Sequence, residues 1–193
     1  MKPGRIIILS GPSGSGKTTL YQKLLADPQF KGHLKRSVSV TTRDKRDGER
    51  HGRDYFFISV DHFLRMRDSG QLLESQKVYQ DYYGTPYRPL RSALKKGKNV
   101  LLCIEVKGAR VVRRKEPDCL AIFVKPPNLT VLKKRLAKRG TESPAVRKAR
   151  FERARMELRD ACRYDYILVN DRLDICYRAL KAVLTRELKH PSS

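Results

Sequence analysis

The sequence predicts an α/β protein in which helices flank a mainly parallel sheet. Three observations support this class. A glycine-rich loop joins a short apolar segment to a helical one near the start of the chain. Further apolar segments alternate with segments of helical periodicity, as in folds built from parallel strands and crossover helices. The length of 193 residues is enough for one hydrophobic core with small insertions.

The first element is the apolar run at residues 6–9, which has the length and composition of a buried strand. Residues 11–18 follow with the letters GPSGSGKT and match the phosphate-loop pattern G-x-x-x-x-G-K-[ST] at every fixed position. A helix comes next, with Leu20 and Leu24 on one face. Backbone amides of the glycines and the helix N-terminus bind phosphates, so this segment predicts a nucleoside triphosphate site.

The roles within this loop follow from its chemistry. Lys17 reaches the β- and γ-phosphate oxygens, and the Thr18 hydroxyl is a ligand for Mg²⁺. The predicted ATP-binding residues of the loop are Gly11, Pro12, Ser13, Gly14, Ser15, Gly16, Lys17, Thr18 and Thr19. Many unrelated ATPases, GTPases and kinases share such a loop, so it does not define a reaction by itself.

A second phosphate-binding segment follows. Residues 35–42 alternate as a short strand that carries Ser39 on one side, and residues 41–55 form a dense loop of arginines, hydroxyls and glycines. Arg43 and Arg46 are suited to bind a monophosphate, because planar guanidinium groups match its oxygens in pairs.

Glu74 places a carboxylate in an otherwise apolar strand. A buried carboxylate requires two donors, and guanine offers N1–H and its 2-amino group side by side, whereas adenine has an acceptor at N1. A site with Glu74 therefore favours guanine, and such discrimination can reach ~10⁴-fold. The segment Tyr82-Tyr83-Gly84-Thr85 lies close by, while Tyr79 and Tyr87 fit core packing equally well.

The α/β alternation then continues to the end of the chain. The other predicted elements are strands at 55–58, 99–106, 119–124 and 166–169 and helices at 60–69, 91–96, 108–115, 129–136 and from 173 onward. Asn128 and Asp171 are the expected N-caps of the last two of these helices.

Residues 125–155 are rich in lysine and arginine. Arg135 and Arg139 lie four residues apart on one helical face, and Arg150 follows on the next helix. This pattern is typical of a lid that brings arginines over a phosphoryl group in transfer.

The composition limits the other classes of function. The 43 Lys and Arg residues against 20 acidic ones give a formal charge of +23, which attracts anions of any kind. A nucleic-acid-binding role is a competing hypothesis, but no RNA module or aromatic platform is recognised. Four cysteines without C-x-x-C spacing resemble buried small hydrophobic residues, and four scattered histidines predict no zinc site. No apolar stretch approaches the ~20 residues of a membrane span, so we expect a cytoplasmic protein.

Taken together, these segments resemble guanylate kinases over nearly the whole chain. The resemblance rests on the phosphate loop, S-V-S-x-T-T-R-x-x-R-x-G-E-x-x-G-x-D-Y at 37–55, YYGT at 82–85, R-L-x-x-R-G-T-E at 135–142 and VND at 169–171. It implies transfer of the γ-phosphoryl group of Mg-ATP to GMP, and by extension to dGMP, giving ADP and GDP.

The resemblance also implies residue roles. The implied catalytic residues are Lys17, Arg43, Arg135, Arg139 and Arg150, with Asn170 near the adenine of ATP. The implied GMP-binding residues are Ser39, Arg43, Arg46, Glu49, Tyr55, Glu74, Tyr83, Gly84, Thr85 and Glu105. Family members usually carry two acidic residues where this chain has Cys103 and Glu105, so Glu105 is expected to have a supporting role.

The fold implied is a P-loop NTPase-type parallel sheet of five strands with a small inserted mixed β/α region and a helical lid. Residues 1–35, 90–127 and 155–193 are expected to form the core, 36–89 the GMP-binding region and 128–154 the lid. Two alternatives are a guanylate-kinase-like module that binds phosphopeptides and a related ribose-bisphosphate kinase. No specific nucleic acid or membrane partner is predicted, and the oligomeric state, monomer or dimer, stays open.

Overall fold

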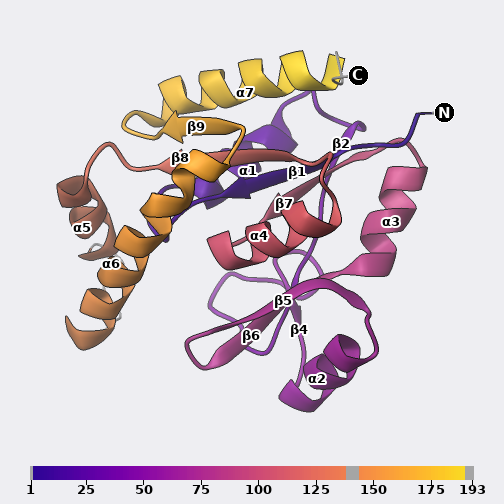
Figure 1. Ribbon diagram of the computed structural model, residues 1–193, viewed down its shortest axis with the longest axis horizontal. Coiled ribbons are helices and arrows are strands. Elements are labelled where there is room, and N and C mark those ends of the chain that lie inside the picture. The colour runs from indigo at the N-terminus through magenta and orange to yellow at the C-terminus, as the bar shows by residue number, and fades with distance from the viewer. Residues whose placement is uncertain (1, 138–143, 190–193) are drawn as a thin grey trace. The chain divides into compact units, whose positions relative to one another are not determined.

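The computed structural model describes residues 2–137 and 144–189 (Figure 1). The chain forms two units. The first contains residues 2–6, 32–102 and 107–119, and the second contains residues 7–31, 103–106, 120–137 and 144–189. Within these described ranges, no helix has the length and apolar character needed to cross a membrane.

A five-stranded sheet contains the strands expected from the apolar segments. They are β1 (Ile6–Ser10), β2 (Leu34–Arg36), β7 (Asn99–Cys103), β8 (Leu120–Lys125) and β9 (Tyr166–Val169), in the order β2-β7-β1-β8-β9. β1 pairs with β8, β8 with β9 and β2 with β7, each in parallel. All residues of β1 are buried, which explains its continuous apolar sequence. The predicted parallel sheet flanked by helices is confirmed.

The first unit also holds a mixed sheet of four strands. These are β3 (Val40–Thr41), β4 (Phe56–Phe57), β5 (Leu72–Val78) and β6 (Asp81–Pro86), in the order β4-β3-β6-β5. The helix α2 (Val60–Asp68) packs on it through Phe63, which is fully buried with Val40 and Leu72. β5 is an edge strand, and its Leu73 carbonyl accepts a hydrogen bond from Lys115 Nζ at 2.7 Å.

The predicted single strand at residues 35–42 is wrong. The segment is divided between β2 of the five-stranded sheet and β3 of the four-stranded sheet. Ser37 donates its backbone N–H to Leu101 in the first sheet, and Ser39 accepts from Phe56 in the second. The segment is extended as predicted, but it passes from one sheet to another. Sequence periodicity does not distinguish one continuous strand from two short strands in different sheets.

The start of α3 and the end of β7 also differ from the predicted boundaries. The helix α3 spans Tyr87–Lys95 and starts before Pro89, which its first turn accommodates because those amides have no partner within the helix. The strand β7 ends at Cys103, and Val106 instead begins the helix α4 (Val106–Lys115). Continuous apolar character across 100–106 concealed this change from strand to helix.

The second unit contains the remaining helices. They are α1 (Lys17–Ala26), α5 (Leu129–Ala137), α6 (Pro144–Leu158), the 3₁₀ helix η1 (Arg159–Arg163) and α7 (Leu173–Lys189). Asn128 caps α5 as predicted, its side chain accepting from Val131 N at 2.9 Å. The predicted cap of α7 is wrong by one residue, because the Arg172 carbonyl accepts the first helical bond, from Cys176 N. Cys162 is exposed, unlike the buried Cys119 and Cys176.

A polar cluster joins the end of α1 to α7. The Asp27 carboxylate accepts hydrogen bonds from Lys181 Nζ at 2.7 Å and from the Tyr177 hydroxyl. Hydrogen bonding to Lys181, then to Tyr177 and the Gln29 backbone, lowers the pKa of Asp27 from its usual 3.8 to about 2. Burial, followed by the bond to Asp27, raises the pKa of Tyr177. The cluster therefore favours an ionised carboxylate in the folded protein.

Replacing Asp27 by Asn is expected to lower the melting temperature at pH 7. The folded-state pKa of Asp27 is depressed, so its contribution is present above about pH 4 and is lost as the pH falls toward 2. The difference between wild type and Asp27→Asn should therefore shrink over that interval. Melting curves from pH 7 to pH 2 test this, with Asp118→Asn, an exposed carboxylate, as the control. A difference that stays constant down to pH 2 would contradict the prediction.

Candidate nucleotide-binding sites

The predicted phosphate loop lies between β1 and α1 in the second unit. Gly16 has φ 92°, a left-handed conformation that favours glycine, and it forms the N-cap of α1. Lys17 is the first residue of that helix, and its Nζ donates to the carbonyls of Gly11 at 2.6 Å and Pro12 at 2.9 Å. The lysine is thus folded over the loop that the sequence assigns to phosphate.

Asn170 lies against the same loop. It follows β9 and is 4% exposed, and its Nδ2 donates to the Ser15 carbonyl at 2.8 Å. A Cβ at Gly16 would lie only 2.2 Å from that Nδ2, so any larger residue would be strained by φ and would also displace the Asn170 amide. Asn170 therefore supports the loop backbone, and its place near the adenine of ATP stays a prediction.

The loop also offers an oxygen ligand for Mg²⁺. Thr18 and Thr19 are exposed in the first turn of α1, directly after Lys17. A hydroxyl at this position of a phosphate loop matches the oxygen chemistry that Mg²⁺ prefers, with the phosphates supplying further ligands. The residues present therefore fit a Mg²⁺ ion that accompanies a nucleotide.

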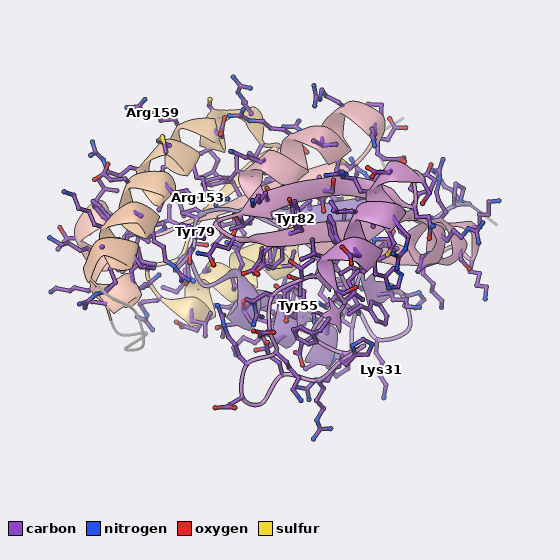
Figure 2. All side chains as sticks on the ribbon, turned by 90° about the horizontal axis from the view of Figure 1, so that it is seen from below. Lys31, Tyr55, Tyr79, Tyr82, Arg153 and Arg159 are labelled. Atoms are coloured by element: carbon purple, nitrogen blue, oxygen red, sulfur yellow. The ribbon has the colours of Figure 1, made fainter. Side chains whose placement is uncertain are left out.

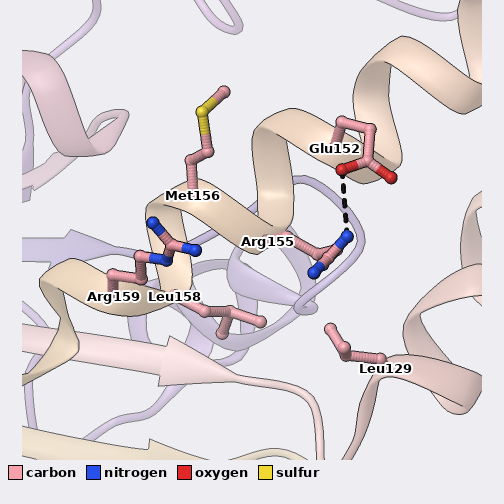
Figure 3. A pocket seen from close by; sticks show the side chains of 6 residues that line it. All are labelled: Leu129, Glu152, Arg155, Met156, Leu158 and Arg159. Carbon is pink, nitrogen blue, oxygen red and sulfur yellow. Dashed lines mark hydrogen bonds and ion pairs between the residues drawn. The ribbon is translucent and has the colours of Figure 1, made fainter.

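The predicted arginines of α5 and α6 lie in the second unit as well. Arg135 is half-buried and donates through Nη2 to the Asp171 carbonyl at 3.3 Å. Arg150 is half-buried on α6, and Arg139 lies outside the described residues. A hollow of about 340 Å³ is lined by Leu129, Glu152, Arg155, Met156, Leu158 and Arg159 (Figure 3). It contains none of the predicted site residues.

In the first unit, Glu49 holds Arg43. Both carboxylate oxygens of Glu49 accept from Arg43 Nη2 at 2.8 Å, and Oε2 also accepts from Arg46 N at 2.9 Å. Burial disfavours the charged form of each group. Against it, hydrogen bonds from the Arg46 backbone and the Arg43 side chain lower the pKa of Glu49. Hydrogen bonding to Glu49 and the interaction with Tyr83 raise the pKa of Arg43. Arg43 is therefore a permanently charged and well-oriented guanidinium, whereas Arg46 is exposed.

Two tyrosines surround Arg43. The Tyr55 and Tyr83 rings meet edge to face with centroids 6.0 Å apart, and the Arg43 guanidinium lies 5.7 Å from the Tyr55 ring centroid. Tyr55 is labelled in Figure 2, and Tyr83 comes from β6. The structure thus brings together three predicted residues from separate segments, Arg43, Tyr55 and Tyr83, each offering a cation or a hydroxyl for an anion.

Glu74 and Thr85 form a buried polar pair on neighbouring strands. Glu74 in β5 is 3% exposed, and its Oε1 accepts from Thr85 Oγ1 in β6 at 2.7 Å. Gly84 beside Thr85 is also buried, and Ser39 is half-buried in the segment that enters β3. A buried carboxylate oriented by one hydroxyl is a strong acceptor for further donors, which is the property that the sequence assigned to guanine recognition.

Gly108 lies beside Glu74, a position that sequence reasoning did not single out. A Cβ at this position of α4 would lie 2.6 Å from Glu74 Oε2 and 3.0 Å from Gln76 Nε2. A methyl group at Gly108 would therefore have to displace the ends of the Glu74 and Gln76 side chains. An isolated glycine within a helical pattern was the available signal.

Gly108→Ala is expected to raise KM for GMP by about 10-fold or more, because the added methyl group displaces the Glu74 carboxylate. KM for ATP should change much less. Steady-state kinetics with each nucleotide varied in turn measure both values. Lys107→Ala, an exposed neighbour on α4, is the control. An unchanged KM for GMP would show that Glu74 can move aside without consequence.

A second set of charged residues that sequence reasoning missed surrounds Glu105. Arg153 on α6, labelled in Figure 2, pairs through Nη2 with Glu105 and donates from Nε to Glu157 Oε1 at 2.9 Å. Glu105 is the predicted supporting carboxylate, two residues beyond the end of β7. Glu157 and Arg153 had no signal in the sequence, since they lie in a helix rich in charges.

Comparison with known proteins shows the family of this chain. The guanylate kinase family model matches residues 3–187. Guanylate kinase of Carboxydothermus hydrogenoformans is 39% identical over 191 residues, covering 99% of this chain and 92% of that protein. Guanylate kinase of Streptococcus thermophilus is 43% identical over 184 residues, covering 95% and 87%. The crystal structure of guanylate kinase from Anaplasma phagocytophilum has a TM-score of 0.80 at 30% identity and covers 97% and 87%. The chain belongs to the guanylate kinase family.

Proposed function

We propose that this protein transfers the γ-phosphoryl group of Mg-ATP to GMP and dGMP, giving ADP and the corresponding diphosphate. Membership of the guanylate kinase family supports ATP-dependent phosphorylation of GMP. The extension to dGMP rests on the residues assigned to the acceptor nucleotide. All of them are assigned to its base or its phosphate, and none to the 2′-hydroxyl of its ribose. Such a reaction belongs to purine nucleotide metabolism, and we place it in the cytoplasm.

The observation that carries the guanine assignment is the buried Glu74–Thr85 pair. Glu74 accepts N1–H and the 2-amino group of guanine, with Ser39, Gly84 and Thr85 completing the base site. Arg43, held by Glu49, binds the GMP phosphate together with Arg46, Tyr55 and Tyr83. A fixed guanidinium and two hydroxyls suit a dianionic phosphate, which accepts several hydrogen bonds at once.

In the second unit, the phosphate loop binds the ATP phosphates through its backbone amides, and Lys17 gives its charge to the β- and γ-oxygens. The Thr18 hydroxyl would hold a Mg²⁺ ion, which would supply positive charge to the phosphates when bound. Arg135, Arg139 and Arg150 stabilise the transferred group, and Asn170 fixes the loop on which the phosphates rest. Phosphoryl transfer needs no side-chain nucleophile, because the acceptor is an ionised GMP oxygen; alignment and charge are sufficient.

The decisive experiment is a coupled ADP-release assay with GMP, dGMP, AMP, CMP and UMP as acceptors. We expect turnover with the two guanine nucleotides and little with the others. Equal turnover of AMP would remove the guanine assignment, and turnover without Mg²⁺ would remove the role of Thr18. The assay also separates this function from a phosphopeptide-binding module, which would release no ADP, and from a ribose-bisphosphate kinase.

We assign the +23 charge no specific nucleic-acid partner. Generic attraction to RNA would show a steep salt dependence, with affinity falling about 10³-fold over a fourfold salt increase for ~6 phosphate contacts. Filter binding of RNA at two salt concentrations tests this, and salt-resistant binding would contradict the assignment.

A further inference from the structure

Arg153 connects two carboxylates of the second unit that come from distant parts of the sequence. One is Glu157, one turn further along α6, and the other is Glu105, which follows β7. The Arg153 side chain is 21% exposed and that of Glu157 11% exposed, so both lie mostly out of water. One guanidinium thus holds two carboxylates through different nitrogens, which its planar fork permits.

The phosphate-loop lysine acts on the same cluster. Burial and then the charge of Glu105 raise the pKa of Glu157, whereas Arg153 and Lys17 act to lower it. Glu105 follows β7 and the phosphate loop follows β1, the neighbouring strand of the parallel sheet, so Glu105 and Lys17 lie at the carboxyl ends of adjacent strands. Lys17, Arg153, Glu105 and Glu157 carry two positive and two negative charges, so the cluster is balanced as long as Arg153 is present.

Lys17 itself binds backbone carbonyls of its own loop, Gly11 and Pro12, at 2.6 and 2.9 Å. Neutral carbonyls are weak competitors for an ammonium group compared with phosphate oxygens or carboxylates. A carboxylate paired with Lys17 would instead compete directly with the nucleotide. Arg153 already occupies the carboxylates of Glu105 and Glu157, which are the charged acceptors of this cluster.

We propose that Arg153 is a positioning residue that acts through Glu105 and Glu157, holding both carboxylates so that Lys17 stays available to the phosphates of ATP. The inference rests on the proposed function, since it assigns Lys17 to the ATP phosphates. Loss of Arg153 leaves two carboxylates and one ammonium, an excess negative charge beside a site for a polyanion. The carboxylates then pair with Lys17 and repel the incoming nucleotide.

The test is a kinetic comparison of four full-length variants. Arg153→Ala should lower kcat/KM for ATP by about 10- to 100-fold, the range expected when a supporting residue of a reacting group is lost. KM for GMP should change much less. Arg153→Lys should retain part of the activity, because lysine keeps the positive charge but lacks the planar guanidinium that binds two carboxylates at once. The double variant Arg153→Ala with Glu157→Gln should recover at least several-fold over Arg153→Ala, since the excess charge is gone.

Arg155 provides the matched control on the same helix. Its Nη1 lies 3.2 Å from Glu152 Oε2, an ion pair drawn in Figure 3, and both side chains are about half exposed. Arg155→Ala removes the same kind of side chain and one ion pair from α6, and it should leave kcat/KM for ATP unchanged. Melting temperatures of all variants identify any that fail to fold.

Two results would overturn the inference. One is wild-type kcat/KM for ATP in a folded Arg153→Ala variant, and the other is a double variant no more active than Arg153→Ala, which would indicate a purely structural tie. Either result leaves the proposed function intact as long as the wild-type protein phosphorylates GMP. Failure of the wild type to release ADP with GMP would instead refute the proposed function itself.

Discussion

Lys17→Ala should lower kcat for GMP phosphorylation by about 10³-fold, the scale of losing one preorganised charge from a transition state. Lys17 begins α1 and is already folded over the loop, with Nζ bonded to the Gly11 and Pro12 carbonyls. Little reorganisation is therefore needed for the ammonium to exchange these weak acceptors for phosphate oxygens. ADP release at saturating ATP and GMP measures the loss.

The control for this experiment is Lys23→Ala, which removes an exposed lysine from the same helix and should retain full activity. A melting curve of Lys17→Ala shows whether the loop variant folds. Activity of a folded Lys17→Ala protein within tenfold of wild type would contradict the assignment of Lys17 to the transferred phosphate.

Glu74→Gln should raise KM for GMP by about 10²-fold or more, with KM for ATP nearly unchanged. A glutamine keeps an oxygen for the Thr85 hydroxyl, whose bond to Glu74 is 2.7 Å long, but replaces the other oxygen by an NH₂ group. The NH₂ group is itself a donor, so it cannot accept from guanine N1–H or the 2-amino group, and these buried donors are left unpaired. A site with such unpaired groups can discriminate between ligands by ~10⁴-fold. Kinetics with GMP varied at saturating ATP measure the effect.

The matched control is Glu116→Gln, which makes the same change at a carboxylate of the first unit that pairs with Arg91 at 3.7 Å. It should leave KM for GMP as in wild type. Unchanged GMP affinity in Glu74→Gln would show that the buried carboxylate does not contact the base. A gain of AMP turnover in Glu74→Gln would strengthen the assignment, because an amide can donate to adenine N1.

The sequence predicted those parts of the fold that local rules determine. The strand before the phosphate loop and the last strand, 166–169, were predicted close to their observed bounds, because each apolar run is fully or partly buried and ends at polar or glycine residues. The failures share a cause. At 35–42 and 99–106 the local pattern continues while the chain changes sheet or changes from strand to helix, and only long-range pairing determines where this happens.

The same limit applies to the candidate sites. Motif residues such as Lys17 and Glu74 are recognisable because their chemistry is unusual for their local context. Asn170 under Ser15, Gly108 against Glu74 and Arg153 between two carboxylates depend on partners dozens of residues away. No spacing rule relates such residues to their partners. The supporting residues of the sites therefore had to come from the structure, whereas the proposed ligand contacts came from the sequence.

The contact of Lys115 with the Leu73 carbonyl has a consequence for self-association. A second copy that joined this sheet by extending it beyond β5 would first have to displace a bound ammonium group, and would then place its own backbone beside that cation. Lysine at an open sheet edge is a recognised protection against such pairing. Any dimer of this protein should therefore form through a different surface.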